Sequence, residues 1–437
     1  MKRVKRLLLT VGFVCLLAVS WLVAITADSD VEKQGKLVSQ AKAYLQDEVY
    51  IRAVPLLEEA ASYTTEQTLQ IETQLKEVYL KLIDKDGFLK KYRSLLNKQM
   101  SRPDALADVY YEAAEHYLNH NKTDDAFEVF RSGIQKTGDV RLTEYYESVR
   151  YQYKTKRSLY EDVTAFYNGT IAVCQNGLWG IIASDGDRLL PCEYDAVSTF
   201  CDDRAFVQKG NVFTAVDQNN NRLVLLHEEA SAIGNYAENR LALCTREGWR
   251  LATGELQLGS TVFQQLGMYA EGYAAAQVNG KWGIVNAGGK EWLLEPQFDR
   301  ILCDSLGRCY SGGAVFVEKN GQVMLLVDGE PVGEVYEDAK PFADGWAAVK
   351  KNGKWGFIDR SGEMKIQPMF EDALSFSGHL AAVKIDGLWG YVSLYGKVVI
   401  EPVFFDVRNF YQGTAPVKTD RGWQFITLLE YEESASL

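Results

Sequence analysis

The chain has 437 residues, a formal net charge of -12 and a pI near 5.1. At about 150 residues per domain, this length predicts two or three folded units. Hydrophobic residues make up 47% and charged residues 24%, an ordinary globular composition that argues against long disordered stretches. Acidic charge repels phosphate backbones, and no Lys/Arg-rich stretch follows the first six residues, so we expect no nucleic-acid partner.

The first thirty residues have the pattern of a membrane anchor. Four basic residues among the first six precede an uncharged run from Leu7 to Ala27, which is long enough to cross a hydrocarbon core of roughly 30 Å. The basic flank predicts a cytoplasmic N-terminus and places the rest of the chain outside. A cleaved signal peptide is the alternative, although its apolar region usually has only about 7 to 15 residues. We therefore predict that residues 1–30 form a cytoplasmic stub and a single-pass signal anchor of a bacterial cell envelope.

Six cysteines follow the anchor, and an exported chain can form disulfides from an even number of them. No CxxC pair occurs, and the segment that contains these cysteines is large enough to fold without cross-links. We expect buried thiols. Cys303 and Cys309 are the closest pair in the sequence and the one worth testing for a disulfide.

Residues 31–157 are predicted to form pairs of helices. From Val31 to Tyr63, apolar residues recur three and four apart, which is the period of amphipathic helices. The spacing resembles that of tetratricopeptide (TPR) repeats, since positions 53, 88 and 126 lie 35 and 38 residues apart, close to a period of about 34. The positions of the pattern are Tyr44, Tyr50, Ala53, Leu57 and Ala60; Tyr79, Phe88, Tyr92 and Leu95; and Tyr117, Ala126, Phe130 and Gly133. Stacked hairpins of this kind have a concave face for partner proteins, whereas a simple spacer is the alternative.

One pattern then recurs eight times. Each unit opens with an aromatic residue, and a second large residue, usually tryptophan, follows thirteen positions later. The openers are Phe166, Phe200, Tyr236, Tyr269, Tyr310, Phe342, Phe376 and Phe410, with successive spacings of 34, 36, 33, 41, 32, 34 and 34. The later residues are Trp179, Phe213, Trp249, Trp282, Val323, Trp355, Trp389 and Trp423. Asn-Gly pairs such as Asn352-Gly353 lie between them and favour type I′ hairpins, so each unit is predicted to be a three-stranded meander.

Four units carry Trp-Gly, at Trp179-Gly180, Trp282-Gly283, Trp355-Gly356 and Trp389-Gly390, whereas Trp249 and Trp423 lack the glycine. The run from Asn352 to Asp359 resembles the core of the bacterial WG repeat family. This resemblance implies a β-rich repeat domain over residues 158–434. Such repeats cannot bury both faces alone, so we expect the tryptophans to pack units together and the glycines to admit a neighbouring strand.

The repeats favour a propeller-like ring over an open β-solenoid. Tyr160-Glu161-Asp162 matches the end of the third strand in later units, for example Phe370-Glu371-Asp372, whereas the last unit lacks such an ending. The first stretch could therefore complete the last unit and close the ring.

Motifs for catalysis or cofactor binding are absent from the sequence. His116 and His120 lie four apart, but Tyr117 replaces the glutamate of an HExxH metalloprotease motif, so we expect no metal site. No GxSxG, Walker loop or Rossmann fingerprint occurs, and we predict no enzyme activity and no cofactor. Acids such as Asp299, Asp359 and Glu371 recur at turns, where they ordinarily cap backbone amides.

We therefore predict a membrane-anchored extracytoplasmic scaffold that binds partner proteins through its helical and WG repeats. Cell-wall or carbohydrate binding is the alternative, because aromatic-rich hairpins can stack on sugar rings. An envelope hydrolase is a third hypothesis, and only scattered carboxylates support it.

Overall fold

The computed structural model describes residues 30–47, 49–82, 103–226 and 229–430. The chain divides into two compact units, Met1–Val149 and Arg150–Leu437. This boundary precedes the predicted one at residue 157, because a strand of the second unit begins at Tyr153. The predicted anchor, Leu7–Ala27, lies outside the described residues. None of the described helices is both long and apolar enough to cross a membrane.

The first unit is helical, as the three- and four-residue periodicity predicts. Residues 30–46 form a helix, and the following helices are α2 (Tyr50–Ala61), α3 (Thr68–Leu82), α5 (Pro103–Asn119), α6 (Thr123–Thr137) and α7 (Val140–Val149). Small residues occur where helices approach closely: a Cβ atom added to Gly133 on α6 would stand only 2.8 Å from Cβ of Tyr110 on α5. Phe88, Tyr92 and Leu95 of the TPR pattern lie outside the described residues, so the TPR resemblance of this segment stays a prediction.

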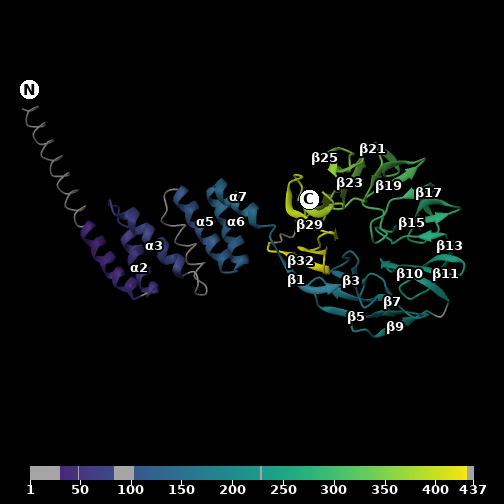
Figure 1. Cartoon of the computed structure of the whole chain (residues 1–437), viewed down its shortest axis with the longest axis horizontal. Helices are drawn as coiled ribbons and strands as arrows, with labels where there is room; N and C mark the ends of the chain where they lie inside the picture. Colours follow the sequence, from purple (N-terminus) through teal and green to yellow (C-terminus); the bar gives the residue numbers. More distant parts are fainter. Residues whose placement is uncertain (1–29, 48, 83–102, 227–228, 431–437) are drawn as a thin grey trace, which may run out of the picture. The chain divides into compact units, whose positions relative to one another are not determined.

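The second unit is an eight-bladed β-propeller (Figure 1). Its eight antiparallel sheets each contain four strands, instead of the three predicted. The additional strand is the first of each blade, and in seven blades it has only two residues, too short for a periodic pattern. These first strands are β2 (Asp162–Val163), β6 (Ala196–Val197), β10 (Ala230–Ala237), β14 (Gln265–Leu266), β18 (Arg300–Ile301), β22 (Asp338–Ala339), β26 (Asp372–Ala373) and β30 (Asp406–Val407).

The second and third strands of each blade form the hairpin that the sequence predicts. The second strands are β3 (Thr170–Gln175), β7 (Ala205–Lys209), β11 (Arg240–Thr245), β15 (Tyr273–Val278), β19 (Ala314–Lys319), β23 (Trp346–Lys351), β27 (Leu380–Ile385) and β31 (Thr414–Thr419). The third strands are β4 (Leu178–Ala183), β8 (Val212–Val216), β12 (Gly248–Thr253), β16 (Lys281–Asn286), β20 (Gln322–Val327), β24 (Lys354–Asp359), β28 (Leu388–Ser393) and β32 (Gly422–Leu428). Asn352 and Gly353 both have positive φ, 52° and 74°, as a type I′ turn requires.

The fourth strand of a blade is its outer edge. In seven blades it follows the third strand along the chain: β5 (Arg188–Tyr194), β9 (Arg222–Leu225), β13 (Leu258–Phe263), β17 (Trp292–Phe298), β21 (Glu330–Tyr336), β25 (Met364–Phe370) and β29 (Val398–Phe404). In the last blade this position is occupied by β1 (Tyr153–Tyr160), which pairs antiparallel with β32. The start of the domain thus completes its final blade and closes the ring.

Candidate functional site

The repeated tryptophans lie on the third strands, where each faces an aromatic residue of the outer strand. Cross-strand partners are Trp179 and Tyr194, Trp249 and Phe263, Trp282 and Phe298, Trp355 and Phe370, Trp389 and Phe404, and Trp423 and Tyr160. Trp355, Trp389 and Trp423 are buried, and the other three are half-buried. Several join clusters that combine side chains of two successive blades, so these tryptophans contribute to packing between blades.

Each Trp-Gly glycine lies directly against the backbone of the outer strand. A Cβ atom would stand 2.6 Å from the carbonyl oxygen of Leu190 if it were added to Gly180. The corresponding distances for Gly356 and Gly390 are 2.5 Å, to the carbonyl oxygens of Ile366 and Ile400, and Gly283 makes the same close approach to Leu294. Real Cβ atoms do not come so close, so the glycine is required wherever the outer strand makes this irregular pairing.

The recurring carboxylates cap hairpin turns in their own blades. Glu161 accepts hydrogen bonds from the backbone amides of Asn176 (3.0 Å) and Gly177 (2.9 Å). Asp299 accepts one from the amide of Asn320 (2.7 Å), and Glu371 accepts one from Gly387 (2.9 Å). These acids therefore serve the fold, because they satisfy turn amides that the ladder leaves without a partner.

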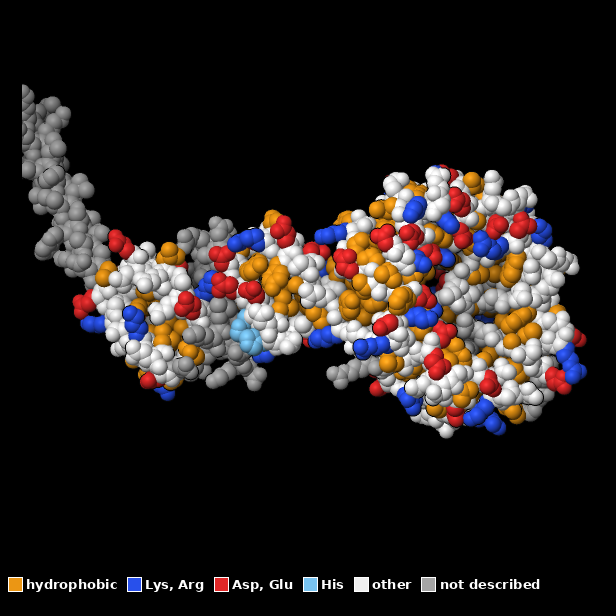
Figure 2. Space-filling view, in the orientation of Figure 1, with side chains coloured by type: hydrophobic (Ala, Val, Ile, Leu, Met, Phe, Trp, Pro, Cys, Tyr) orange, Lys and Arg blue, Asp and Glu red, His pale blue; other side chains and the backbone are white. Residues whose placement is uncertain are grey.

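A hollow of about 810 Å³ opens in the propeller, and we call it the funnel. Figure 2 shows charged side chains near the hollowed middle of the propeller. The loops between first and second strands supply most of its lining, and they come from seven of the eight blades. Its aromatic lining residues are Phe166, Tyr167, Tyr269, Tyr310, Phe342, Trp389, Phe410 and Tyr411, and its charged ones are Glu238, Glu271, Asp304, Arg308, Lys340, Asp344, Asp406 and Arg408.

Hydrogen bonds between blades hold the rim of the funnel. Glu238 of the third blade accepts hydrogen bonds from the amides of Glu271 (2.6 Å) and Gly272 (2.8 Å) in the fourth. The carboxylate of Glu271 in turn accepts from the amide of Gly312 in the fifth blade (2.7 Å). The loop tips of the fourth and fifth blades are therefore each fixed by the preceding blade, so this part of the rim is a preorganised surface.

One loop reaches inward from the fifth blade, and we call residues 302–309 the plug loop. Leu306 at its tip is buried with Ala237 and Met268 of the third and fourth blades. Asn235 donates a side-chain hydrogen bond to the carbonyl oxygen of Leu306 (2.9 Å). The guanidinium of Arg308 lies 5.7 Å from the ring centre of Tyr167, in the first blade. The sequence signal of this loop is the spacing of 41 between Tyr269 and Tyr310, which predicts an insertion but not its direction.

The cationic side chains of the funnel differ in their partners: the two arginines form ion pairs, whereas the lysine contacts an aromatic ring. Arg308 forms an ion pair with Asp304 (2.7 Å), and Arg408 forms one with Asp406 (3.1 Å). The ammonium group of Lys340 lies 5.1 Å from the ring centre of Trp355. Burial raises the pKa of Tyr167 and of Tyr269 to about 12, so both phenols are neutral at physiological pH. The funnel thus offers aromatic rings, hydroxyl groups and the ammonium group of Lys340.

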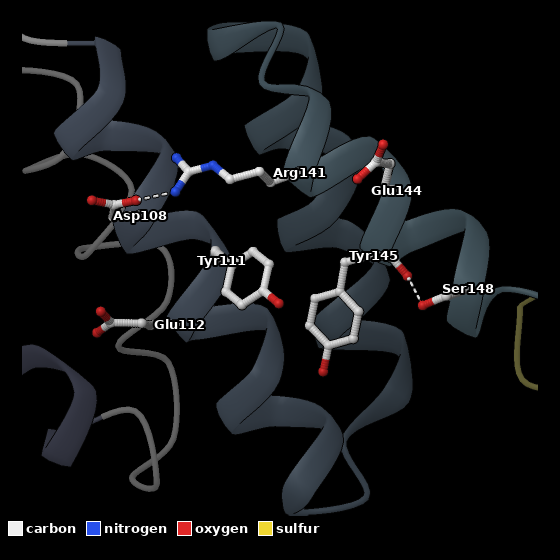
Figure 3. Close-up of a pocket in the computed structure, with 7 residues that line it drawn as sticks. All are labelled: Asp108, Tyr111, Glu112, Arg141, Glu144, Tyr145 and Ser148. Atoms are coloured by element: carbon white, nitrogen blue, oxygen red, sulfur yellow. Dashed lines mark hydrogen bonds and ion pairs between the residues drawn. The ribbon is translucent and has the colours of Figure 1, made fainter.

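The helical unit has a second, smaller hollow of about 480 Å³ between α5 and α7, which we call the tyrosine groove (Figure 3). Tyr111 and Tyr145 face one another there, with ring centres 4.9 Å apart. Arg141 on α7 reaches Asp108 on α5 in an ion pair of 2.9 Å. The other residues that line the tyrosine groove are Glu112, Glu144 and Ser148. This groove lies in the segment where the sequence predicts a surface for partners.

The histidine pair is on α5 and the turn that follows it. Nδ1 of His120 lies 2.8 Å from the carbonyl oxygen of His116, and the two rings are 4.1 Å apart. Among the described residues, no group of three or more potential metal-binding side chains lies together. No histidine lines the funnel.

These observations define the class of protein: a closed eight-bladed β-propeller, following a helical unit, with a preorganised funnel. The family model described as "WG containing repeat" matches residues 159–179, 179–213, 261–282, 329–355, 355–389 and 389–423. The chain therefore belongs to the WG-repeat proteins, as its Trp-Gly pattern predicts. A comparison with curated protein sequences finds no match.

Several solved structures are similar to parts of the chain. A eukaryotic initiation factor aligns with 57% of this chain and 78% of its own, at 12% identity and a TM-score of 0.40. The extracellular domain of a hybrid two-component system from B. thetaiotaomicron aligns with 63% of this chain, at 12% identity and a TM-score of 0.33. This chain spans 46% of the length of that extracellular domain. The Neurospora crassa Pan2 WD40 domain aligns over 69% of this chain and 95% of its own, at 8% identity and a TM-score of 0.35.

Proposed function

We propose that this WG-repeat protein is a membrane-anchored extracytoplasmic scaffold whose funnel binds a segment of a partner protein. The observation that carries the proposal is the lining of the funnel, which combines the partly exposed Tyr167, Tyr310, Tyr411, Arg308 and Arg408 on a preorganised rim. Tyrosine, tryptophan and arginine dominate the energetically important centres of protein interfaces, and a rigid site loses little entropy on binding.

Binding is favoured over catalysis because the carboxylates of the funnel already have structural partners. Glu238 and Glu271 cap loop tips, Asp304 and Asp406 pair with arginines, and Asp344 accepts a hydrogen bond from the amide of Gly378 (2.6 Å). A hydrolase needs a carboxylate or nucleophile that is available to the substrate. Turnover of glycan or peptide substrates by the purified protein would contradict the proposal.

The carbohydrate alternative receives less support from the side chains. Sugar-binding platforms expose the face of an aromatic ring, but the described tryptophans are all buried or half-buried. The exposed ring of Tyr395 is on a turn of the seventh blade and does not line the funnel. We therefore place the binding surface in the funnel and take a polypeptide as its ligand.

Site-specific photo-crosslinking in cells tests the proposal. A photoreactive phenylalanine analogue replaces Tyr411 in the funnel, and the matched control carries it at Tyr395. We expect a defined protein adduct from position 411 that is absent from position 395, identified by mass spectrometry through a tag after Leu437. Adducts of equal yield from both positions would contradict a funnel site, and recovery of wall glycan alone would favour the carbohydrate alternative.

The anchor has its own test. We propose that Leu7–Ala27 crosses the membrane once and leaves the helical unit and the propeller outside. Alkaline phosphatase, which needs export to become active, is fused after Leu437. We expect an active, membrane-bound fusion, and an inactive one when residues 2–27 are deleted. Activity released from the membrane fraction would instead indicate a cleaved signal peptide.

A further inference from the structure

Cys303 and Cys309 flank the turn of the plug loop. The amide of Asp304 donates a hydrogen bond to the carbonyl oxygen of Arg308 (2.8 Å), which pairs these two residues across the turn. Cys303 and Cys309 are the next residues outward and therefore lie opposite one another. Opposed residues of antiparallel strands have Cα atoms about 4.5 to 5.5 Å apart, which is inside the range of about 4.4 to 6.8 Å that disulfides require.

The side chains of this pair also meet. Both cysteines join the same apolar cluster, in which Cys309 is buried and Cys303 is partly buried. The neighbouring Cys303 thiol, together with burial, raises the pKa of the Cys309 thiol well above its usual value. Cys303 lines the funnel, so a reagent can reach it from there.

The turn is fixed independently of any cross-link. One carboxylate oxygen of Asp304 accepts hydrogen bonds from the amides of Leu306 and Arg308, both 2.9 Å. The other accepts from the guanidinium of Arg308 (2.7 Å). The turn that sets Cys303 opposite Cys309 is therefore formed before oxidation, so closing a disulfide requires little rearrangement of the backbone.

We propose that Cys303 and Cys309 form a reversible disulfide that fastens the two ends of the plug loop to one another. The oxidant is a small-molecule disulfide. The Cys303 thiolate attacks one of its sulfur atoms, the S–S bond breaks, and one thiolate leaves. Cys309, deprotonated in the second step, attacks the sulfur of Cys303 in the mixed disulfide and expels the second thiolate. The two protons lost by the cysteines are taken up by the two released thiolates, so the loop gains a disulfide and the oxidant becomes two thiols.

The other described cysteines lack this arrangement. Cys174 is on β3 and Cys192 is on β5, and β4 lies between these strands. Two strand spacings amount to about 9.6 Å, beyond the limit of about 7 Å between Cα atoms. Cys201 and Cys244 belong to different blades. These four cysteines serve as internal controls for selective oxidation.

The test uses trypsin, because Arg308 lies between the two cysteines. The purified full-length protein is exposed to oxidised glutathione, its remaining thiols are alkylated under denaturing conditions, and it is digested. Cleavage after Arg300, Arg308 and Lys319 places Cys303 and Cys309 in separate peptides. We expect these peptides, 301–308 and 309–319, to be joined, to lose two hydrogen atoms in mass and to separate on reduction. The peptides that carry the four control cysteines should be alkylated.

Two serine variants separate this pairing from general thiol reactivity. In Cys309→Ser, Cys303, which lines the funnel, should retain one glutathione as a mixed disulfide. In Cys303→Ser, the buried Cys309 should stay unmodified. If the native wild-type protein gains glutathione at Cys303 without forming the joined peptides, or remains fully reduced, the pairing is wrong.

Hydrogen exchange tests the fastening role. We expect the amides of Leu306, Gly307 and Arg308 to exchange more slowly in the oxidised wild-type protein than in the reduced one, with no such change in the double variant Cys303→Ser/Cys309→Ser. Equal exchange in the two redox states, despite a joined peptide, would contradict the role of the disulfide in fastening the loop. Neither measurement depends on what the funnel binds.

Discussion

Tyr160 lies directly opposite Trp423 in the antiparallel pair of β1 and β32. The two residues are at opposite ends of the propeller sequence, yet they reproduce the cross-strand pair that Phe370 and Trp355 form within a single repeat. Trp423 is almost fully buried and packs with Val163 and Phe166 of the first blade. The closure of the ring therefore places the last tryptophan in the core between the last and first blades.

Removing β1 should open the ring. We predict that a chain of residues 161–437 unfolds at a temperature roughly 10 °C lower than a chain of residues 150–437, because losing a large buried aromatic contact alone costs about 3 to 5 kcal/mol. The unpaired edge of β32 should also promote self-association. Calorimetry and light scattering measure the two effects.

The 150–437 chain is the matched control, since it retains β1 and begins at the boundary between the two units. We expect the 150–437 chain to be monomeric and to unfold in one cooperative transition. Equal stability of the two chains would show that β1 contributes nothing to the ring.

Gly390→Ala should destabilise the propeller by about 1 to 3 kcal/mol, the usual cost of forcing an extra carbon into a packed site. The new Cβ atom would stand 2.5 Å from the carbonyl oxygen of Ile400 and 2.8 Å from the nitrogen of Pro402. Denaturant unfolding measures the change. In the control Gly35→Ala, the added carbon meets no heavy atom within 4 Å and lies in a helix, so we expect no loss. A Gly390→Ala protein as stable as the wild type would contradict the close approach.

Asp359 should contribute stability that disappears in acid. Burial tends to raise its pKa, but hydrogen bonds from Ser361 and Lys365 and from the amides of Ser361 and Glu363 outweigh that effect and lower the pKa to about 2. Because the folded-state pKa lies below the usual value of 3.8, the contribution is complete above about pH 4 and is lost as the pH falls toward 2. Its size is about 2 kcal/mol at most.

Asp359→Asn therefore should be less stable than the wild type at pH 7, and the difference should shrink between pH 4 and pH 2. Denaturant unfolding across this pH range measures it. Asp420→Asn, at an exposed position in a turn, should show no comparable difference. If the difference in stability between Asp359→Asn and the wild type stays constant down to pH 2, the charge of Asp359 is not its cause.

Tryptophan fluorescence should be weakly quenched by acrylamide in the folded protein and strongly quenched after unfolding in urea. None of the described tryptophans is fully exposed, so a collisional quencher reaches them less readily in the folded protein than after unfolding. The measurement uses a Trp21→Phe chain, which removes the emission of the predicted anchor. Strong quenching in the native state, reversed by added wall glycan, would support sugar binding and count against our proposal.

Local sequence patterns were sufficient to predict the blade hairpins, their number and the closure of the ring. Asn352 and Gly353 favour a type I′ turn, and the tryptophan thirteen residues after the first aromatic residue of a unit indicates a repeated packing site. Both signals lie within a few residues of the chain, so the sequence alone is enough to detect them. The prediction that the glycine of each Trp-Gly pair admits a neighbouring strand is also confirmed, since the backbone of the outer strand lies directly against it. The strand that precedes each hairpin was missed, since two residues such as Asp372 and Ala373 carry no periodic signal.

Tertiary structure alone decided where the candidate site lies. The funnel combines side chains from seven blades, so no local pattern links Tyr167 with Arg308, and the spacing of 41 signals an insertion without showing that Leu306 points inward. The roles of the carboxylates depend on the same assembly, because Glu238 and Glu271 cap amides of neighbouring blades. A repeat sequence determines the units and their order through short-range geometry, whereas the residues that meet at the axis depend on how eight units close into one ring.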